Sequence, residues 1–161
     1  MALMFGCTSS NQTYISYSPT FKVEITSRDL EQATIFLSDG ISVKFSDESS
    51  ISGLLITKKL ESLNSSFNLH DYPKYILGLK NLNGLQEQEA NLFSSSLKEI
   101  QYSYNLQNIS EYHADGKSTY VICSSESCLS YIVKAENVEQ ILMVTGINIQ
   151  KSKFIQIIKG I

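Results

Sequence analysis

Few residues of this chain could do chemistry: three cysteines and two histidines stand out among its 161 residues. Cys123 and Cys128 enclose the segment Ser-Ser-Glu-Ser, which lies between two runs of strand-forming residues and has the pattern of a hairpin loop. Side chains of a non-hydrogen-bonded pair approach closely enough for a disulfide. Cytosolic proteins rarely keep such bridges. We predict a structural disulfide between Cys123 and Cys128, and with it export to an oxidising compartment.

The register set by this bridge has consequences for its neighbours. It places two further pairs on the opposite face of the ribbon, toward the core: Ile122 with Leu129, and Tyr120 with Tyr131. A reduced cysteine pair is the main alternative. A zinc site needs two more ligands, and His70 and His113 are distant in sequence with no paired spacing. A redox pair is more typically spaced CxxC. We predict no metal site and no cofactor.

The opening of the chain combines an apolar stretch, a small residue and a cysteine, in Met4-Phe5-Gly6-Cys7, followed by polar Thr8. This resembles the lipobox of bacterial lipoproteins, in which the cysteine is lipidated and becomes the first residue after signal-peptide cleavage. Phe5 departs from the small residue preferred there, and the stretch is shorter than the ~7–15 apolar residues of a working leader. A buried or free cysteine is the alternative. The resemblance implies lipid on Cys7 and a periplasmic position, at the outer membrane because no aspartate follows.

Enzyme signatures are absent from the sequence, which has no GxSxG elbow, no P-loop, no GxGxxG after a strand and no HExxH. A Ser–His–Asp set could be assembled from His113, Asp115 and one of many serines, but so many serines give the match little specificity. His113 lies beside a turn, where a solvated histidine is ordinary. His70 precedes Asp71, which can cap a helix. We therefore predict no catalytic residue and a protein that is not an enzyme.

Composition bounds the class of protein. With 42% hydrophobic and 18% charged residues the chain can bury a core. The formal net charge is −3, the lysines are scattered and Arg28 is the only arginine, so a nucleic-acid partner is disfavoured. No run approaches the ~20 apolar residues of a spanning helix. The membrane is therefore expected to be reached only through the lipid anchor.

Strand signals dominate the first third. Phe21-Lys22-Val23-Glu24-Ile25 alternates apolar and polar residues, as a half-buried strand does. The runs 34–37 and 41–45 flank Asp39-Gly40, which predicts a hairpin. The run 51–60 predicts a further strand, in which Gly53 could mark a bulge.

Helix signals follow, and then strands return. Asp71 is placed to cap a helix with Pro73 in its first turn. Apolar residues recur at three and four positions from Leu85 to Tyr104, which predicts an amphipathic helix with Glu89 on its polar face. Further strands are expected at 108–112, 118–123, 128–134 and 140–145, and a last amphipathic helix begins near Gln150.

This order of elements predicts an α+β fold, a mostly antiparallel β-sheet packed against two or three amphipathic helices. The predicted organisation is a remnant of the signal peptide and lipobox with a flexible tether over residues 1–18, and a single domain over residues 19–161. The polar, Ser- and Asn-rich composition of residues 8–18 is the reason for expecting a tether there.

The order of elements, with 21–25 near the start, Tyr120-Val121-Ile122 in a late strand and Phe154-Ile155-Gln156-Ile157-Ile158 at the end, resembles the PsbP/Mog1/DcrB-like group. The likeness covers most of the chain but carries no diagnostic motif, and the group's aromatic-and-proline pattern after the first strand is absent. The group consists mainly of non-catalytic accessory and binding proteins. The resemblance therefore implies binding.

These observations favour an exported, non-enzymatic lipoprotein that binds another protein, a toxin or an envelope component. One concrete version is an immunity protein that neutralises a toxin delivered into the periplasm. The alternatives are a carrier or sensor of a small apolar ligand, and a hydrolase with an unrecognised site. A carrier should contain a closed apolar cavity, and a protein binder an exposed apolar patch. A hydrolase should bring His113 or His70 to a serine and a carboxylate in a cleft.

Overall fold

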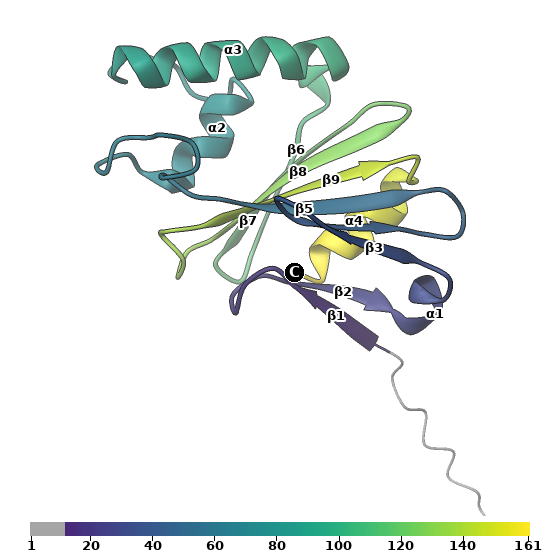
Figure 1. Ribbon diagram of the computed structural model, residues 1–161. Coiled ribbons are helices and arrows are strands. Elements are labelled where there is room, and N and C mark those ends of the chain that lie inside the picture. Colours follow the sequence, from purple (N-terminus) through teal and green to yellow (C-terminus); the bar gives the residue numbers. More distant parts are fainter. Residues whose placement is uncertain (1–11) are drawn as a thin grey trace, which may run out of the picture.

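A seven-stranded antiparallel sheet organises the protein, in the strand order β3-β4-β5-β9-β8-β7-β6 (Figure 1). The computed structural model describes residues 12–161. The strands of this sheet are β3 Thr34–Leu37, β4 Ile41–Lys44, β5 Ser50–Ile56, β6 Ser110–Ala114, β7 Lys117–Cys123, β8 Ser127–Lys134 and β9 Ile141–Ile147. Two more strands, β1 Gln12–Ser16 and β2 Lys22–Thr26, form a separate antiparallel hairpin. The helices are α1 Ser27–Leu30, α2 Tyr72–Ile76, α3 Glu87–Ser103 and α4 Lys151–Lys159.

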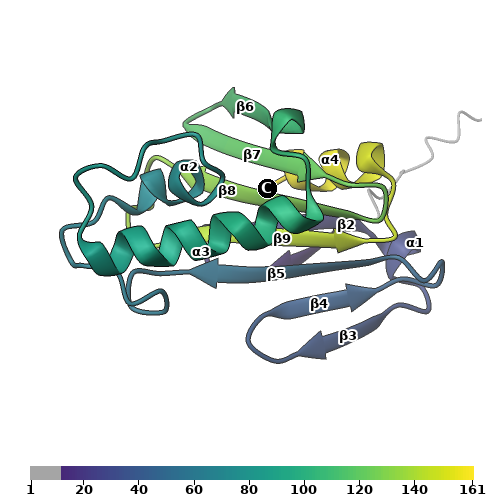
Figure 2. The same cartoon turned by 90° about the horizontal axis from the view of Figure 1, so that it is seen from above.

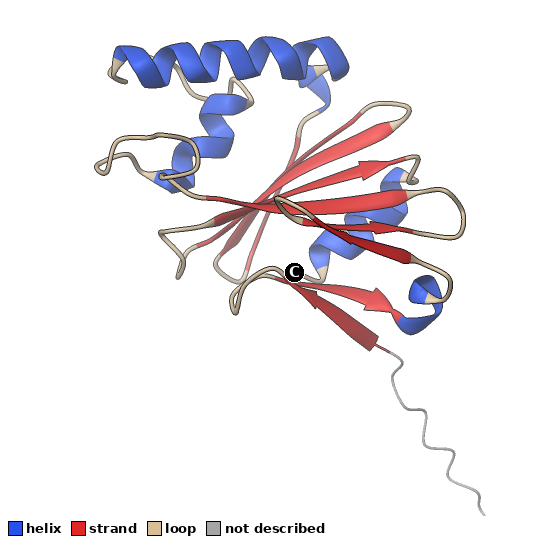
Figure 3. Ribbon diagram, viewed as in Figure 1, coloured by secondary structure: helices blue, strands red, loops and turns tan. Residues whose placement is uncertain are grey.

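Both faces of the sheet are covered, by different elements (Figures 1 and 3). Helices α2 and α3 lie over one face, where Phe93 of α3 packs with its ring centroid 5.3–5.6 Å from those of Phe67, Tyr72 and Tyr75. The β1–β2 hairpin and α4 cover the other face, where Phe154 is fully buried. Seen from above, α3 crosses the middle of the sheet and leaves β3 and β4 uncovered (Figure 2). The predicted α+β fold with a mostly antiparallel sheet is confirmed.

Two local predictions are confirmed. Asp39-Gly40 lies in the turn of the β3–β4 hairpin, with Leu37 opposite Ile41. The amphipathic helix is α3, which buries Phe93 and Ile100. Its Glu89 is also buried, although it was predicted on the polar face. A Glu89 carboxylate oxygen accepts a hydrogen bond from the Asn64 N–H at 3.1 Å. Glu89 therefore fastens the loop after β5 to the helix instead of facing solvent.

Residues 12–16 correct the predicted tether. This stretch forms β1, which pairs along its whole length with β2, and Ile15 is buried in the core. A polar sequence can form a strand when a neighbouring strand satisfies its backbone and one apolar side chain reaches the core. The flexible tether predicted for residues 1–18 is therefore wrong from Gln12 onward.

Gly53 and Asp71 also have roles other than those predicted. The ladder through Gly53 is continuous, with Ile41 on one side and Val144 on the other, so there is no bulge. Strand β5 ends at Ile56, earlier than expected. Asp71 stands before α2 but makes no capping hydrogen bond; its carboxylate pairs with Lys74 and Lys80 at 3.1 and 2.9 Å. Burial alone would raise the pKa of Asp71, but the two lysines outweigh it and lower that pKa.

Candidate functional site

The predicted disulfide is present, between Cys123 at the end of β7 and Cys128 in β8, with the two Cα atoms 4.1 Å apart. The register is the predicted one, with Ile122 opposite Leu129 and Tyr120 opposite Tyr131. Those two pairs belong to the core under α2 and α3, while Cys128 is buried in the core on the α4 side. The bridge thus joins two strands that are packed on both faces, which is a structural role.

Cys7 lies outside the described residues, so its predicted lipidation stays a prediction. Over the described part of the chain, no helix is both long and apolar enough to cross a bilayer. Residues 12–161 also hold no group of three or more histidine, cysteine or acidic side chains that could bind a metal ion.

His113 does contact a serine and lie near a carboxylate. Its Nδ1 lies 3.0 Å from the Ser118 hydroxyl, and its Nε2 lies 3.6 Å from a Glu111 oxygen. The three side chains meet because Ser118 is the cross-strand partner of His113, and Glu111 is two residues earlier on the same face of β6. The carboxylate beside His113 thus belongs to Glu111 and not to Asp115, the acid considered from the sequence.

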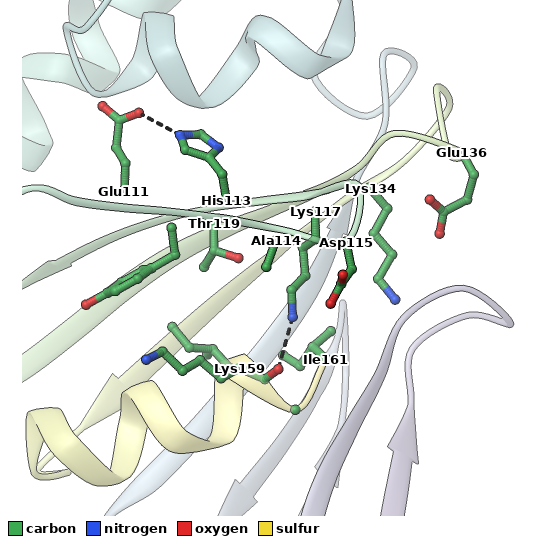
Figure 4. A pocket seen from close by; sticks show the side chains of 13 residues that line it. Glu111, His113, Ala114, Asp115, Lys117, Thr119, Lys134, Glu136, Lys159 and Ile161 are labelled. Carbon is green, nitrogen blue, oxygen red and sulfur yellow. Dashed lines mark hydrogen bonds and ion pairs between the residues drawn. The ribbon is translucent and has the colours of Figure 1, made fainter.

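The solvent exposure of Glu111, His113 and Ser118 does not favour catalysis. The His113 side chain is 60% exposed on an edge strand, and general-base chemistry gains from a site that excludes water. In Figure 4 the side chains of Glu111 and His113 lie on the other side of the ribbon from Lys117, although both residues are among those around the cavity described below. His70 has a structural contact, since its Nε2 lies 2.9 Å from the Asn137 carbonyl oxygen. This contact joins the 3-10 helix Leu69–Asp71 to the loop between β8 and β9.

A concavity of about 750 Å³ lies between the β6–β7 hairpin and the end of α4 (Figure 4). Three lysines contribute to its wall: Lys117, Lys134 and Lys159. Tyr112 adds apolar surface, while Ile158 and Ile161, also among the lining residues, are buried. The cavity is open to solvent and has charged walls, unlike the closed apolar cavity that a carrier of an apolar molecule requires. The sequence offered no sign of it, because its lysines are far apart along the chain.

An exposed apolar strand is the other notable surface. Strand β3 is an edge of the seven-stranded sheet, and its Ile35, Phe36 and Leu37 are 53%, 52% and 77% exposed. Ile35 and Leu37 lie on one face, opposite Val43 and Ile41 of β4, and Phe36 lies on the other face, opposite Ser42. We call Thr34–Leu37 the β3 edge. An exposed apolar edge of this kind is a surface on which another chain can add a strand.

Comparisons with known proteins give no relative for this chain. A scan against protein-family models finds no match. Searches of curated proteins and of solved structures also find none. The likeness to the PsbP/Mog1/DcrB-like group therefore remains a prediction from the order of elements.

Proposed function

We propose that this protein is a non-enzymatic protein-binding module that takes up an extended segment of its partner along the β3 edge. The observation that carries the proposal is the exposure of three consecutive large apolar side chains on a strand that has no neighbouring strand on its outer side. Backbone N–H and C=O groups along such an edge supply hydrogen bonds to an added strand, and alternate side chains supply specificity.

The two edges of the sheet differ in a way that supports this proposal. The opposite edge, β6, carries Glu111 and His113 on one face, and charged side chains are a common protection against unwanted strand pairing. The β3 edge has no charge, no proline and no bulge. A protein that protects one edge and leaves the other apolar is expected to use the second one.

The surroundings of the β3 edge define the chemistry of the partner segment. Ile35 and Leu37 on one face and Phe36 on the other call for apolar side chains at alternating positions of the added strand. Glu31 precedes the edge and Asp39 follows it, both exposed. The partner is therefore an extended apolar segment flanked by basic residues.

Location in the bacterial envelope forms part of the proposal. The Cys123–Cys128 bridge supports an oxidising compartment, and lipid on Cys7 would hold the domain on the periplasmic side of the outer membrane. A toxin-neutralising immunity protein is one such binder, because it needs a partner surface and no active site.

The β3 edge is tested by site-specific photo-crosslinking in the native envelope. A crosslinker at Leu37 should trap one partner in high yield, whereas one at Tyr102 of α3, which is 94% exposed, should not. The purified partner should then bind the wild-type domain and lose binding to Phe36→Glu, while Val138→Glu, at another exposed apolar side chain, binds normally. Equal trapping at both positions, or unchanged binding by Phe36→Glu, contradicts the proposal. Trapping of a second copy of this chain at Leu37 would replace it with self-association.

The membrane part of the proposal has its own test. Cys7→Ser should move the native full-length protein from the membrane fraction to the soluble periplasm. If the variant stays with the membrane, lipid on Cys7 does not anchor the protein.

A further inference from the structure

Two lysines of the cavity stand directly opposite each other. Lys117 of β7 and Lys134 of β8 are cross-strand partners, so their side chains lie on the same face of the sheet, toward α4. Like charges directly opposite each other destabilise a sheet. Lys159 at the end of α4 brings a third positive charge to the same cavity. This arrangement costs stability unless something else compensates for it.

The ammonium groups of these lysines are not neutralised by carboxylates. Lys117 Nζ donates to the Lys159 carbonyl at 3.0 Å, and Lys134 Nζ donates to the Thr20 carbonyl at 2.9 Å. Lys159 Nζ lies 5.0 Å from the centre of the Tyr112 ring. Of the ion pairs formed between residues 12 and 161, none includes any of the three lysines.

Three acidic residues, Glu111, Asp115 and Glu136, also line the cavity. None of the ion pairs within residues 12–161 joins one of them to Lys117, Lys134 or Lys159. Glu111 is directed to His113 on the other side of the strand (Figure 4). Burial lowers the pKa of Lys117 and the charge of Lys134 lowers it further, while Asp115 in the β6–β7 turn raises it only in part. Lys117 is thus half-buried beside the ammonium group of Lys134, its cross-strand partner, and an anion placed between the two would be attracted by both.

We infer that the cavity between the β6–β7 hairpin and the end of α4 binds an organic anion, with the lysines receiving its carboxylate or phosphate and the half-buried Tyr112 contacting its apolar part. A volume of about 750 Å³ fits the range of small-molecule sites. The cavity and the β3 edge lie at opposite edges of the sheet, so this inference does not depend on the proposed protein partner.

Simple amphipathic anions test the site. Octanoate and octyl phosphate, titrated into the 15N-labelled protein, should saturably shift the amide signals of Lys117, Lys134 and Lys159, while octanol should not. Inorganic phosphate alone should bind more weakly, because it leaves the apolar wall unused. Equal shifts by octanol and octanoate, or no saturable shift by either anion, would overturn the inference.

Variants show whether the lysines are responsible. Lys117→Gln/Lys134→Gln should weaken octanoate binding about tenfold or more, as expected for the loss of a charge-assisted hydrogen bond. The variant should fold, because it removes a like-charge pair. Asp115→Asn should tighten binding, since it removes a negative charge that acts on Lys117. Lys98→Gln on the exposed side of α3 makes a single charge change elsewhere and should leave affinity unchanged. If Lys98→Gln weakens binding as much as the double variant, or Asp115→Asn has no effect, the cavity is not the binding site.

Discussion

The ring of Tyr17 lies against the backbone of Gly53, so closely that a Cβ on residue 53 would come within 2.3 Å of ring carbons. The Tyr17 hydroxyl donates to the carbonyl of Ile41 at 3.2 Å. Ile41 is the cross-strand partner of Gly53. The Tyr17 side chain, from the β1–β2 connection, therefore contacts both β4 and β5 of the large sheet. This contact requires glycine at position 53.

The Tyr17–Gly53 contact predicts a strongly coupled pair of substitutions. Gly53→Ala should lower the free energy of unfolding by about 1–3 kcal/mol, because the new methyl overlaps the ring. In a Tyr17→Ala background the same change should have a much smaller effect, because the obstructing ring is gone. Urea denaturation of the four proteins of this cycle measures the coupling. Additive effects would show that the ring does not limit residue 53.

Alkaline pH should weaken the fold through Tyr17. Burial raises the pKa of Tyr17 from 10.0 to about 12, so the folded state holds the phenolic proton more tightly than the unfolded chain does. The stabilisation is fully present below pH 10 and is lost as the pH rises through about 12. Burial also raises the pKa of Tyr72 and Tyr131. The free energy of unfolding should therefore fall over this range, less steeply in Tyr17→Phe; an equal slope in both proteins would exclude Tyr17 as a cause.

Removal of the disulfide should be tolerated at a modest cost. Replacing Cys123 and Cys128 by serine should lower the free energy of unfolding by roughly 2 kcal/mol, the loop-entropy value for so short a loop. Circular dichroism should remain that of the wild type, because both strands are held by the core on each face. Mass spectrometry of unreduced peptides from periplasmic protein should show the bridge, and finding both thiols free would remove this support for export.

Replacing Ser130, in the middle of β8, by alanine should stabilise the protein. Ser130 is fully buried, and its hydroxyl has no hydrogen-bond partner among the described residues. Ser130→Ala removes an unsatisfied polar group and should raise the free energy of unfolding by about 1 kcal/mol. Ser42→Ala is the matched control, because the Ser42 hydroxyl lies 2.7 Å from that of Ser52; it should not stabilise. Destabilisation by Ser130→Ala would mean that the hydroxyl has a partner, such as a buried water.

The two histidines should respond differently to truncation. His113→Ala changes an exposed side chain and should alter stability by no more than about 0.5 kcal/mol. His70→Ala removes the contact with Asn137 and should cost about 1 kcal/mol. Both variants should still bind the partner captured at Leu37. Loss of biological function in His113→Ala, with folding intact, would instead favour a hydrolase built on Glu111, His113 and Ser118.

Sequence reasoning succeeded where the pattern was local. The hairpin at Asp39-Gly40 and the bridge at Cys123 and Cys128 each depend on a few adjacent residues. Both are present, and the strands of the bridge have the predicted register. Strand β1 was missed because Gln12–Ser16 is a strand only through its pairing with β2. Gly53 was misread for a similar reason, since its partner Tyr17 lies far earlier in the chain.

The candidate surfaces could not be predicted from the sequence. The run 34–37 looks as apolar as a core strand, and its exposure follows from its place at the edge of the sheet. Lys117, Lys134 and Lys159 face one cavity only because β7, β8 and α4 converge there. Strand order and helix placement are tertiary properties, and the spacing of residues along the chain does not contain them.

The central pairing of β5 with β9 has a consequence for the order in which the domain assembles. Strands β7, β8 and β9 follow one another and pair as neighbours, so their ladder closes through short loops. Ile56 meets Ile141 only after α2, α3 and three strands have intervened, and closing so long a loop is entropically costly and slow. We therefore expect the sheet of β7, β8 and β9 to form first during folding. Strands β3, β4 and β5 are expected to pair with β9 later.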